Sequence, residues 1–185
     1  LAKNGFKSTI FEADDRLGGM AASFDFAGLE IERYYHFHCL SDYSFFELLK
    51  ELKLFSQLKW VNTSMGFFYD NFLYKWGSPL AVLKFDKISF AARIRYLFHA
   101  ARCIFTKDWR KLDKINAISW LENWLGKKCY EILWSKLFQY KFYNFSNNVS
   151  AAWIYSRIRR IGISRSNLKE KLGYLEGGSK RWISA

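Results

Sequence analysis

The sequence predicts an α/β fold, in which a short α/β opening leads into a mainly helical body with a small β element. Three observations predict it. Residues 1–4 followed by Gly5 are typical of a last helical turn with its left-handed cap, and residues 7–11 then alternate as a strand does. Aromatic runs at 24–37 and 66–76 are broken by turn residues. Beyond residue 78, apolar side chains recur at helical spacing.

Composition indicates a folded chain made of two different parts. Half of the 185 residues are hydrophobic and one in five is aromatic, which excludes a disordered protein. Of the net charge of +12, residues 1–58 carry 6 basic and 9 acidic side chains, residues 59–149 carry 15 and 6, and residues 150–185 carry 8 and 2. A basic, aromatic body suits nucleic acid, an anionic membrane surface or an anionic small molecule.

The opening is expected to run from helix to strand to glycine pair. The strand ends on Glu12, and the chain continues into Gly18 and Gly19. Residues 24–37 should form two short strands around Ala27 and Gly28. Ser41 can cap a following helix, because five Phe and Leu residues between 45 and 54 fall close to helical spacing.

The body is expected to begin with a hairpin and continue as helices. Residues 66–76 should form two aromatic strands around Asp70 and Asn71, and Ser78 followed by Pro79 should start a short helix. Further helices are predicted at residues 89–105, 117–125, 128–140 and 150–161, the second ending at Gly126 and the last before Gly162.

Glu12 is the first candidate functional residue. A strand ending in a carboxylate about 20 residues after a Gly-rich turn is the second half of a dinucleotide-binding βαβ unit, where the acid accepts hydrogen bonds from a ribose. Counting back from Glu12 places that turn before Leu1, so we expect this chain to be an internal piece of a longer protein. A solvated carboxylate is the alternative interpretation of Glu12.

A longer pattern carries a family resemblance. Residues 1–5 (LAKNG) and 10–23 (IFEADDRLGGMAAS) resemble the start of flavin-containing amine oxidase superfamily proteins, a group with protoporphyrinogen oxidases, phytoene desaturases and UDP-galactopyranose mutases. Later segments, including residues 66–70 (GFFYD) and 172–178 (LGYLEGG), resemble a bacterial and archaeal subgroup described as NAD(P)/FAD-dependent oxidoreductases. Asp14 and Met20 stand where the amine oxidase branch often has Arg, which argues against a true amine oxidase.

The resemblance implies three regions and one cofactor. Residues 1–40 would form a truncated Rossmann-like FAD-binding element, residues 41–171 a mainly helical substrate domain, and residues 172–185 the start of a return to the FAD domain. The implied reaction is flavin-mediated hydride transfer from a small-molecule substrate. Because the phosphate-binding turn and a second FAD-binding segment would lie outside the chain, we expect residues 1–185 alone to bind FAD poorly or not at all and to be inactive.

The resemblance also implies roles for particular residues. Glu12 would bind the ribose of FAD, while Gly18 and Gly19 would let the backbone approach the cofactor. Arg16 and Ser23 belong to the same motif and are expected to contact FAD as well.

His36 and His38 lie two residues apart on a predicted strand, beside Cys39. A metal site needs three or four ligands, so we expect no metal here and favour an ordinary hydrogen-bonded histidine. The resemblance adds a third interpretation, in which His36 lies near the flavin and is catalytic, as a hydrogen-bond donor or proton relay.

The helix over 89–105 gathers apolar residues on one side: Phe90, Ile94, Leu97, Phe98, Ala101 and Phe105. We expect this side to face the core and its arginines to face solvent, with docking on a membrane surface as the alternative. No nucleic-acid motif accompanies the basic residues, so a nucleic-acid partner is not expected.

Two readings compete with the flavin oxidoreductase. One is a basic amphipathic module on anionic membranes, and the other is a cofactor-free binding domain derived from such an enzyme. No apolar run reaches the roughly 20 residues of a membrane span. Three widely separated cysteines favour a reducing compartment, hence a cytoplasmic location, with contact at the inner membrane face left open.

Overall fold

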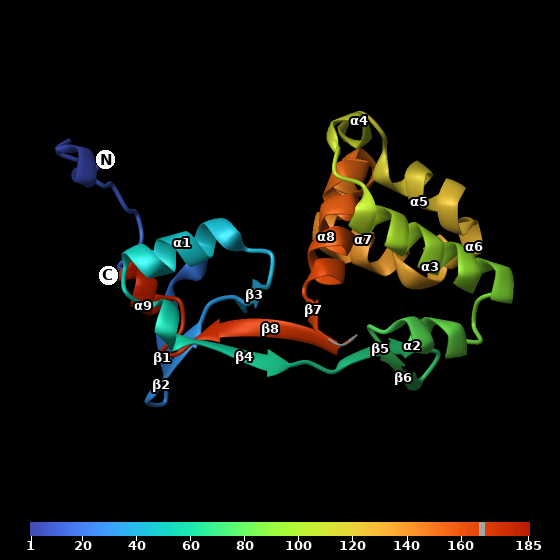
Figure 1. Ribbon diagram of the computed structural model, residues 1–185, viewed down its shortest axis with the longest axis horizontal. Helices are drawn as coiled ribbons and strands as arrows, with labels where there is room; N and C mark the ends of the chain where they lie inside the picture. The colour runs from blue at the N-terminus through green and yellow to red at the C-terminus, as the bar shows by residue number, and fades with distance from the viewer. Residues whose placement is uncertain (167–168) are drawn as a thin grey trace. The chain divides into compact units, whose positions relative to one another are not determined.

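A computed structural model describes residues 1–166 and 169–185, which fall into two compact units (Figure 1). Unit 1 comprises Leu1–His38, Asp42–Val61 and Gly173–Ala185, and unit 2 comprises Cys39–Ser41 and Asn62–Leu172. Residues 42–61 therefore belong with the opening segment, whereas the sequence analysis groups them with the helical domain. Residues 173–185 belong with the opening segment too.

The strands form small sheets. They are β1 (Ser23–Phe26), β2 (Leu29–Glu32), β3 (His38–Cys39), β4 (Leu58–Asn62), β5 (Met65–Tyr69), β6 (Phe72–Trp76), β7 (Arg165–Ser166) and β8 (Lys169–Leu175). β1 pairs with β2 and β5 with β6, both antiparallel. The remaining strands have the order β3-β8-β4, with β7 antiparallel to β8.

Helices make up most of the rest of the described chain. The α-helices are α1 (Tyr43–Glu51), α2 (Pro79–Lys84), α3 (Phe90–Phe105), α4 (Arg110–Asp113), α5 (Ala117–Leu125), α6 (Lys127–Leu133), α7 (Ser135–Phe142), α8 (Ala151–Ile163) and α9 (Lys180–Ile183). Short 3-10 helices cover Ala2–Asn4, Gly19–Ala21, Phe55–Gln57 and Tyr143–Asn148. Mixed helix and sheet is compatible with the predicted α/β class.

Both predicted hairpins are confirmed by their pairing and turns, but the first ends at Glu32 and not at residue 37, so the strand predicted at His36 is wrong. Ala27 and Gly28 between β1 and β2 have φ of 54° and 84°, and Asp70 and Asn71 between β5 and β6 have φ of 52° and 61°. Two successive residues with positive φ are the signature of the type I′ turn, whose twist matches that of paired strands. In the first hairpin Ser23 lies opposite Glu32 and Asp25 opposite Glu30, so these polar residues share one face.

The predicted strand over residues 7–12 is not formed. Residues 6–12 have no regular secondary structure, and their side chains are exposed. A strand exists only with a hydrogen-bonded neighbour, and the described sheets offer none to this segment. The helix end before it is confirmed, since Ala2–Asn4 closes a helical turn and Gly5 has φ of 78°. The Rossmann-like βαβ unit thus stays a prediction.

Unit 1 has a small core beneath α1. Leu49, Leu54, Leu58 and Leu175 are buried together, and Trp182 of α9 packs on them. The helix predicted after residue 41 is confirmed as α1, but the predicted cap is wrong: Asp42, not Ser41, occupies the N-cap position. The helix begins one residue later than the Ser41 cap requires.

Unit 2 has the larger core, and its helices begin as the sequence predicts. Ser78 and Ser89 accept hydrogen bonds from the N–H groups of Ala81 and Ala92 at 3.1 and 3.2 Å, which caps α2 and α3. α5 ends at Gly126, as expected. Phe85, Leu121, Leu125, Phe138 and Ile154 are buried at the centre of this unit.

Two helix boundaries differ from the prediction. Residues 128–140 form two helices, α6 and α7, because Trp134 leaves the helical conformation and the Ser135 hydroxyl donates to the carbonyl of Glu131 at 2.5 Å, a bond that bends helices. Gly162 lies inside α8 and does not end it. A Cβ there would stand 2.6 Å from Cδ1 of Ile104, so this glycine permits close packing on α3.

The apolar side of α3 is not the side that faces the core. The buried residues of α3 are Ala92, His99 and Cys103, whose small or flat side chains let the helix approach α5 and α8. Phe90 and Phe105 of the predicted core face are 66% and 81% exposed. The expectation of a core-facing apolar side is therefore wrong. Helical periodicity identified the stripe but not the side on which neighbouring helices pack.

Candidate functional site

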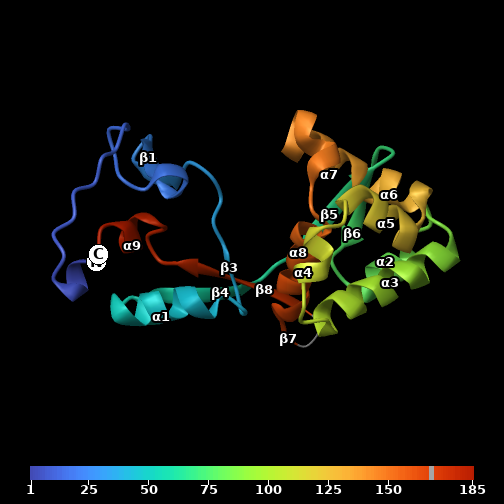
Figure 2. The same cartoon turned by 90° about the horizontal axis from the view of Figure 1, so that it is seen from above.

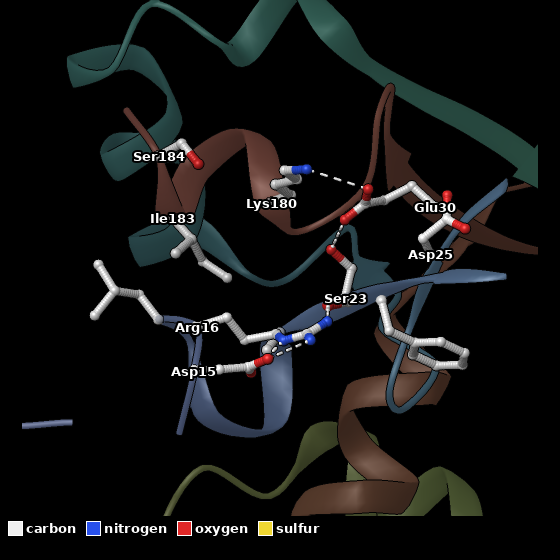
Figure 3. Close-up of a pocket in the computed structure, with 11 residues that line it drawn as sticks. Asp15, Arg16, Ser23, Asp25, Glu30, Lys180, Ile183 and Ser184 are labelled. Carbon is white, nitrogen blue, oxygen red and sulfur yellow. Dashed lines mark hydrogen bonds and ion pairs between the residues drawn. The ribbon is translucent and has the colours of Figure 1, made fainter. Parts of the chain in front are cut away.

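A hollow of about 440 Å³ lies in unit 1 between the β1–β2 hairpin, the turn before it and α9 (Figure 3). Charged and hydroxyl side chains line much of it, and Ile183 and Phe24 supply apolar wall. Of the sequence-predicted site residues, Arg16 and Ser23 lie here. The polar lining residues are Asp15, Arg16, Ser23, Asp25, Glu30, Lys180 and Ser184.

Arg16 donates a hydrogen bond from each of its three side-chain nitrogens to its own chain. Its Nε and one terminal nitrogen each donate to Asp15 at 2.8 Å, and the other terminal nitrogen donates to the Ser23 carbonyl at 2.9 Å. The hydrogen bonds from Arg16 hold the pKa of Asp15 well below its usual range, and Asp15 in turn raises the pKa of Arg16. This fork ties the glycine turn to the first residue of β1 and fixes one wall of the hollow.

The opposite wall is a chain of three polar side chains. The Ser23 hydroxyl donates to one oxygen of Glu30, and the ammonium of Lys180 donates to the other at 3.1 Å. The hydrogen bonds from Ser23 and then Lys180 lower the pKa of Glu30, so this carboxylate is ionised at neutral pH. Lys180 belongs to α9, so residues 150 positions apart meet at the hollow.

Glu32 joins the hairpin to the start of α9. One carboxylate oxygen accepts the Ser179 N–H at 2.6 Å and its hydroxyl at 2.5 Å, and the other accepts the His36 N–H at 3.2 Å. Partial burial alone would raise the pKa of Glu32, but the bonds from Ser179 and His36 outweigh it and lower the pKa. The carboxylate also satisfies the Ser179 N–H at the start of α9, where an anion is favoured.

His36 makes the hydrogen bond expected of an ordinary histidine. Its Nδ1 lies 3.2 Å from the second oxygen of Glu32, and its side chain is one-third exposed. His38 stacks on Phe45 with ring centroids 4.0 Å apart. Within the described chain, no group of three His, Cys, Asp or Glu side chains is arranged to hold a metal ion.

Glu12 lies outside the hollow, on the exposed segment that leads to it. Its Oε1 accepts the Asp14 N–H at 3.0 Å, and the described residues provide no hydrogen bond to Oε2. The carboxylate is thus oriented by the backbone and retains an open acceptor.

The glycine pair has two different roles. A Cβ on Gly18, with φ of 113°, would stand 2.6 Å from Ile183 and 3.2 Å from the Ala22 nitrogen. Packing against α9 therefore requires glycine there, a reason that the sequence analysis missed. Gly19, with φ of 54°, has open space where a Cβ would lie, as an approach to its backbone requires.

A second hollow, of about 260 Å³, lies in unit 2 between α3, α4 and α8. Cys103 and Tyr155 line it beside Arg102 and Lys111. Burial raises the pKa of Cys103 to about 12, so the sulfur stays a thiol at neutral pH and is a poor nucleophile. The Tyr155 hydroxyl is bonded to the Thr106 carbonyl. This hollow offers no activated group for chemistry.

Comparison with known proteins decides the family. A family model described as flavin containing amine oxidoreductase matches residues 1–176. The chain belongs to the flavin-containing amine oxidoreductase family. A search of curated proteins gives no match. The match confirms the resemblance to the flavin-containing amine oxidase superfamily, and it makes FAD the cofactor of the family to which this chain belongs.

Membership in the flavin-containing amine oxidoreductases implies an oxidoreductase when the protein is intact. Sequence reasoning selected Arg16 and Ser23 at the hollow but missed Glu30, Glu32 and Lys180. Alternation of Glu30 and Glu32 on β2 was the only available signal, since period-two spacing puts both on one face. Their partners Ser179 and Lys180 are almost 150 residues away, and no local pattern connects them.

Proposed function

We propose that this chain provides the adenosine-binding end of the FAD site, and part of the substrate domain, of an oxidoreductase that takes hydride from a small-molecule substrate. The observation that carries the proposal is the family match over residues 1–176, which includes Glu12, the glycine pair and those residues of the hollow that lie between positions 15 and 30. When bound, FAD would supply the electron-accepting ring that the side chains of this protein lack.

The hydrogen-bonding and charged groups at Glu12 and around the hollow favour binding of the ribose end of FAD over binding of its pyrophosphate. Three carboxylates and two cations surround the hollow, so its charge does not favour a dianion. Glu12 has an oriented carboxylate with an open acceptor, suited to ribose hydroxyl groups. A pyrophosphate instead needs backbone N–H groups at a helix start, as in a Gly-x-Gly-x-x-Gly turn, and residues 1–185 contain no such sequence.

We assign distinct tasks to the chain's own residues. Glu12 binds the ribose, Gly19 lets the backbone come close to the cofactor, and the Arg16–Asp15 fork holds that turn in position. His36 is oriented by Glu32, whose carboxylate lies 3.2 Å from Nδ1, and we assign it the role that the family resemblance implies, as a hydrogen-bond donor or proton relay.

The test is flavin retention by the gene product that carries this chain. We expect wild type to copurify with FAD and Glu12→Ala to bind it about 10- to 100-fold more weakly, because a charged acceptor to the ribose hydroxyls contributes roughly 1.5 to 3 kcal/mol. Equilibrium titration of the flavin-free proteins, followed by flavin fluorescence, gives both dissociation constants.

Glu47→Ala is the matched control, because Glu47 is an exposed carboxylate in the same unit that accepts a hydrogen bond from Lys50 at 2.7 Å. It should bind FAD as wild type does. Equal affinity of wild type and Glu12→Ala would remove Glu12 from the site, and a wild type with no affinity for FAD would refute the proposed function.

A further inference from the structure

The outer face of α3 carries a row of exposed apolar side chains, which we call the α3 stripe: Phe90, Ile94, Phe98 and Phe105. They are 66%, 45%, 62% and 81% exposed. The spacing of 4, 4 and 7 residues keeps all four on one side of the helix over about 24 Å of its length. Figure 2 shows α3 at the outer edge of unit 2. Burial of four such side chains against a partner would be favourable, so the stripe is a candidate docking face.

The charges beside the stripe indicate what kind of partner it fits. α3 contains Arg93, Arg95 and Arg102 and no acidic residue. At 100° per residue, Arg95 and Arg102 follow one flank of the stripe and Arg93 follows the other. Positive charge on both sides of an apolar stripe is the pattern of a helix that lies in the plane of an anionic lipid surface.

The arginines are anchored to the protein yet keep their charge. Arg95 donates to the Leu125 carbonyl at 2.9 Å and Arg93 to the Leu83 carbonyl at 2.8 Å. Arg102 lies 4.9 Å from the ring centre of Trp124. Carbonyl and ring partners leave these charges unneutralised, unlike a carboxylate partner, so the face of unit 2 around α3 remains positive.

The segment after α3 extends the same chemistry. Residues 106–114 contain four basic and two acidic side chains. Trp109, which is 47% exposed, stands beside Arg110, and tryptophan prefers the boundary between lipid and water. No helix among the described residues has the length and apolar character to cross a bilayer.

We propose that the α3 stripe and its flanking arginines dock this protein on anionic phospholipid membranes. The four apolar side chains enter the boundary between headgroups and acyl chains, and the arginines contact lipid phosphates. The same chemistry makes a protein partner a weaker fit, because such a partner would need an apolar groove bordered by acids on both sides.

Cosedimentation with vesicles tests this proposal. The probes are vesicles of phosphatidylcholine alone and of phosphatidylcholine with about 30% phosphatidylserine, at about 0.1 M and about 0.5 M salt. We expect binding to the anionic vesicles at the lower salt, a severalfold loss at the higher salt and little binding to the neutral vesicles. No binding to anionic vesicles at the lower salt, or equal binding to both compositions, would overturn the proposal.

A pair of double variants locates the contact. Phe90→Ser with Phe105→Ser should reduce partitioning at least about tenfold, because two phenyl groups leave the lipid. Phe72→Ser with Phe145→Ser is the control, since these residues are similarly exposed, at 64% and 73%, and also belong to unit 2. All four side chains are exposed, so both variants should fold, which circular dichroism verifies.

The comparison also separates lipid from other occupants. If both double variants lose binding equally, α3 is not the docking face and the proposal fails. If the α3 variant alters only self-association in sedimentation velocity and leaves vesicle binding unchanged, the stripe is a contact between copies of the chain and the lipid proposal is wrong.

Discussion

His99 lies sealed in the core of unit 2, where one of its nitrogens has no partner. Its exposure is 1%, and Trp120 and Trp124 lie against it with ring centroids 4.4 and 5.4 Å away. Nδ1 makes no hydrogen bond to the described residues, while Nε2 lies 4.0 Å from the Cys103 sulfur. Burial, helped by the nearby charge of Arg102, lowers the pKa of His99 to about 4. The ring is therefore neutral in the folded protein near pH 7.

This burial predicts acid sensitivity of unit 2. The unfolded chain binds a proton on His99 near pH 6.5 and the folded chain only near pH 4, so the free energy of unfolding falls as the pH drops through that interval. The loss from His99 should approach roughly 3 kcal/mol at pH 4. Denaturant unfolding followed by tryptophan fluorescence at pH 7.5, 5.5 and 4 measures it, and His99→Leu should lack this component. Parallel pH dependence in the two proteins would contradict the assignment.

At the residue scale, the contacts of the candidate site residues could not be predicted from the sequence. Arg16 and Ser23 lie at the hollow, but Arg16 donates its hydrogen bonds to Asp15 and to the Ser23 carbonyl. A Cβ at Gly18 would collide with the Ile183 side chain, a contact that no local sequence pattern could reveal. Glu32 was missed because its partner Ser179 is 147 residues away and only the folded chain brings them together.

Among the elements, α9 depends most on a single side chain. It has four residues, too few to be stable by itself, and Glu32 binds the Ser179 N–H and hydroxyl at its start. Trp182 of α9 adds apolar contact with the unit 1 core. Because Lys180 projects from α9 to Glu30, the position of this helix also sets the shape of the hollow.

Glu32→Gln should loosen α9 without changing the size of the side chain. We expect amide hydrogen exchange over residues 180–184 to accelerate about tenfold or more at neutral pH, because hydrogen bonds to a charged acceptor contribute roughly 1.5 to 3 kcal/mol. The folded pKa of Glu32 lies below 4.5, so its contribution is complete above that pH and is lost as the pH falls through the lower folded value.

The control for this experiment is Glu176→Gln, in the same segment. Glu176 is exposed and lies 3.7 Å from Lys59, so its charge should matter little. Unchanged exchange at α9 in Glu32→Gln, or an equal change in the two variants, would show that packing by Trp182 holds the helix without the carboxylate.

Elements with local signals were predicted and those with distant partners were not. Each hairpin has a pair of turn-forming residues that can be recognised in the sequence, and two helices begin after the capping residues Ser78 and Ser89. β4 and β8 pair across more than 100 residues, a relation that single-sequence patterns do not contain. The α3 stripe was found, but which side packs depends on the neighbours α5 and α8.

Across the whole molecule, the boundary between the acidic and basic parts of the sequence differs from the boundary between the two compact units. Residues 1–58 are net acidic, whereas residues 59–185 carry the excess of basic side chains, most of them in unit 2. The sequence predicted this polarity and the α/β class. It did not predict that residues 42–61 join the opening segment, because that grouping depends on Leu49, Leu58 and Leu175 meeting in one core, whereas a return of residues 172–185 was expected from the family resemblance.

The central claim is that the adenosine end of FAD binds at Glu12 and the turn that follows it. Hydrogen exchange of the flavin-free gene product, with and without added FAD, tests it most directly. We predict slower exchange across residues 12–23 on binding, since the ligand would cover backbone that is exposed there, and no change in α6. Saturating FAD that leaves exchange over residues 12–23 unchanged would contradict the account.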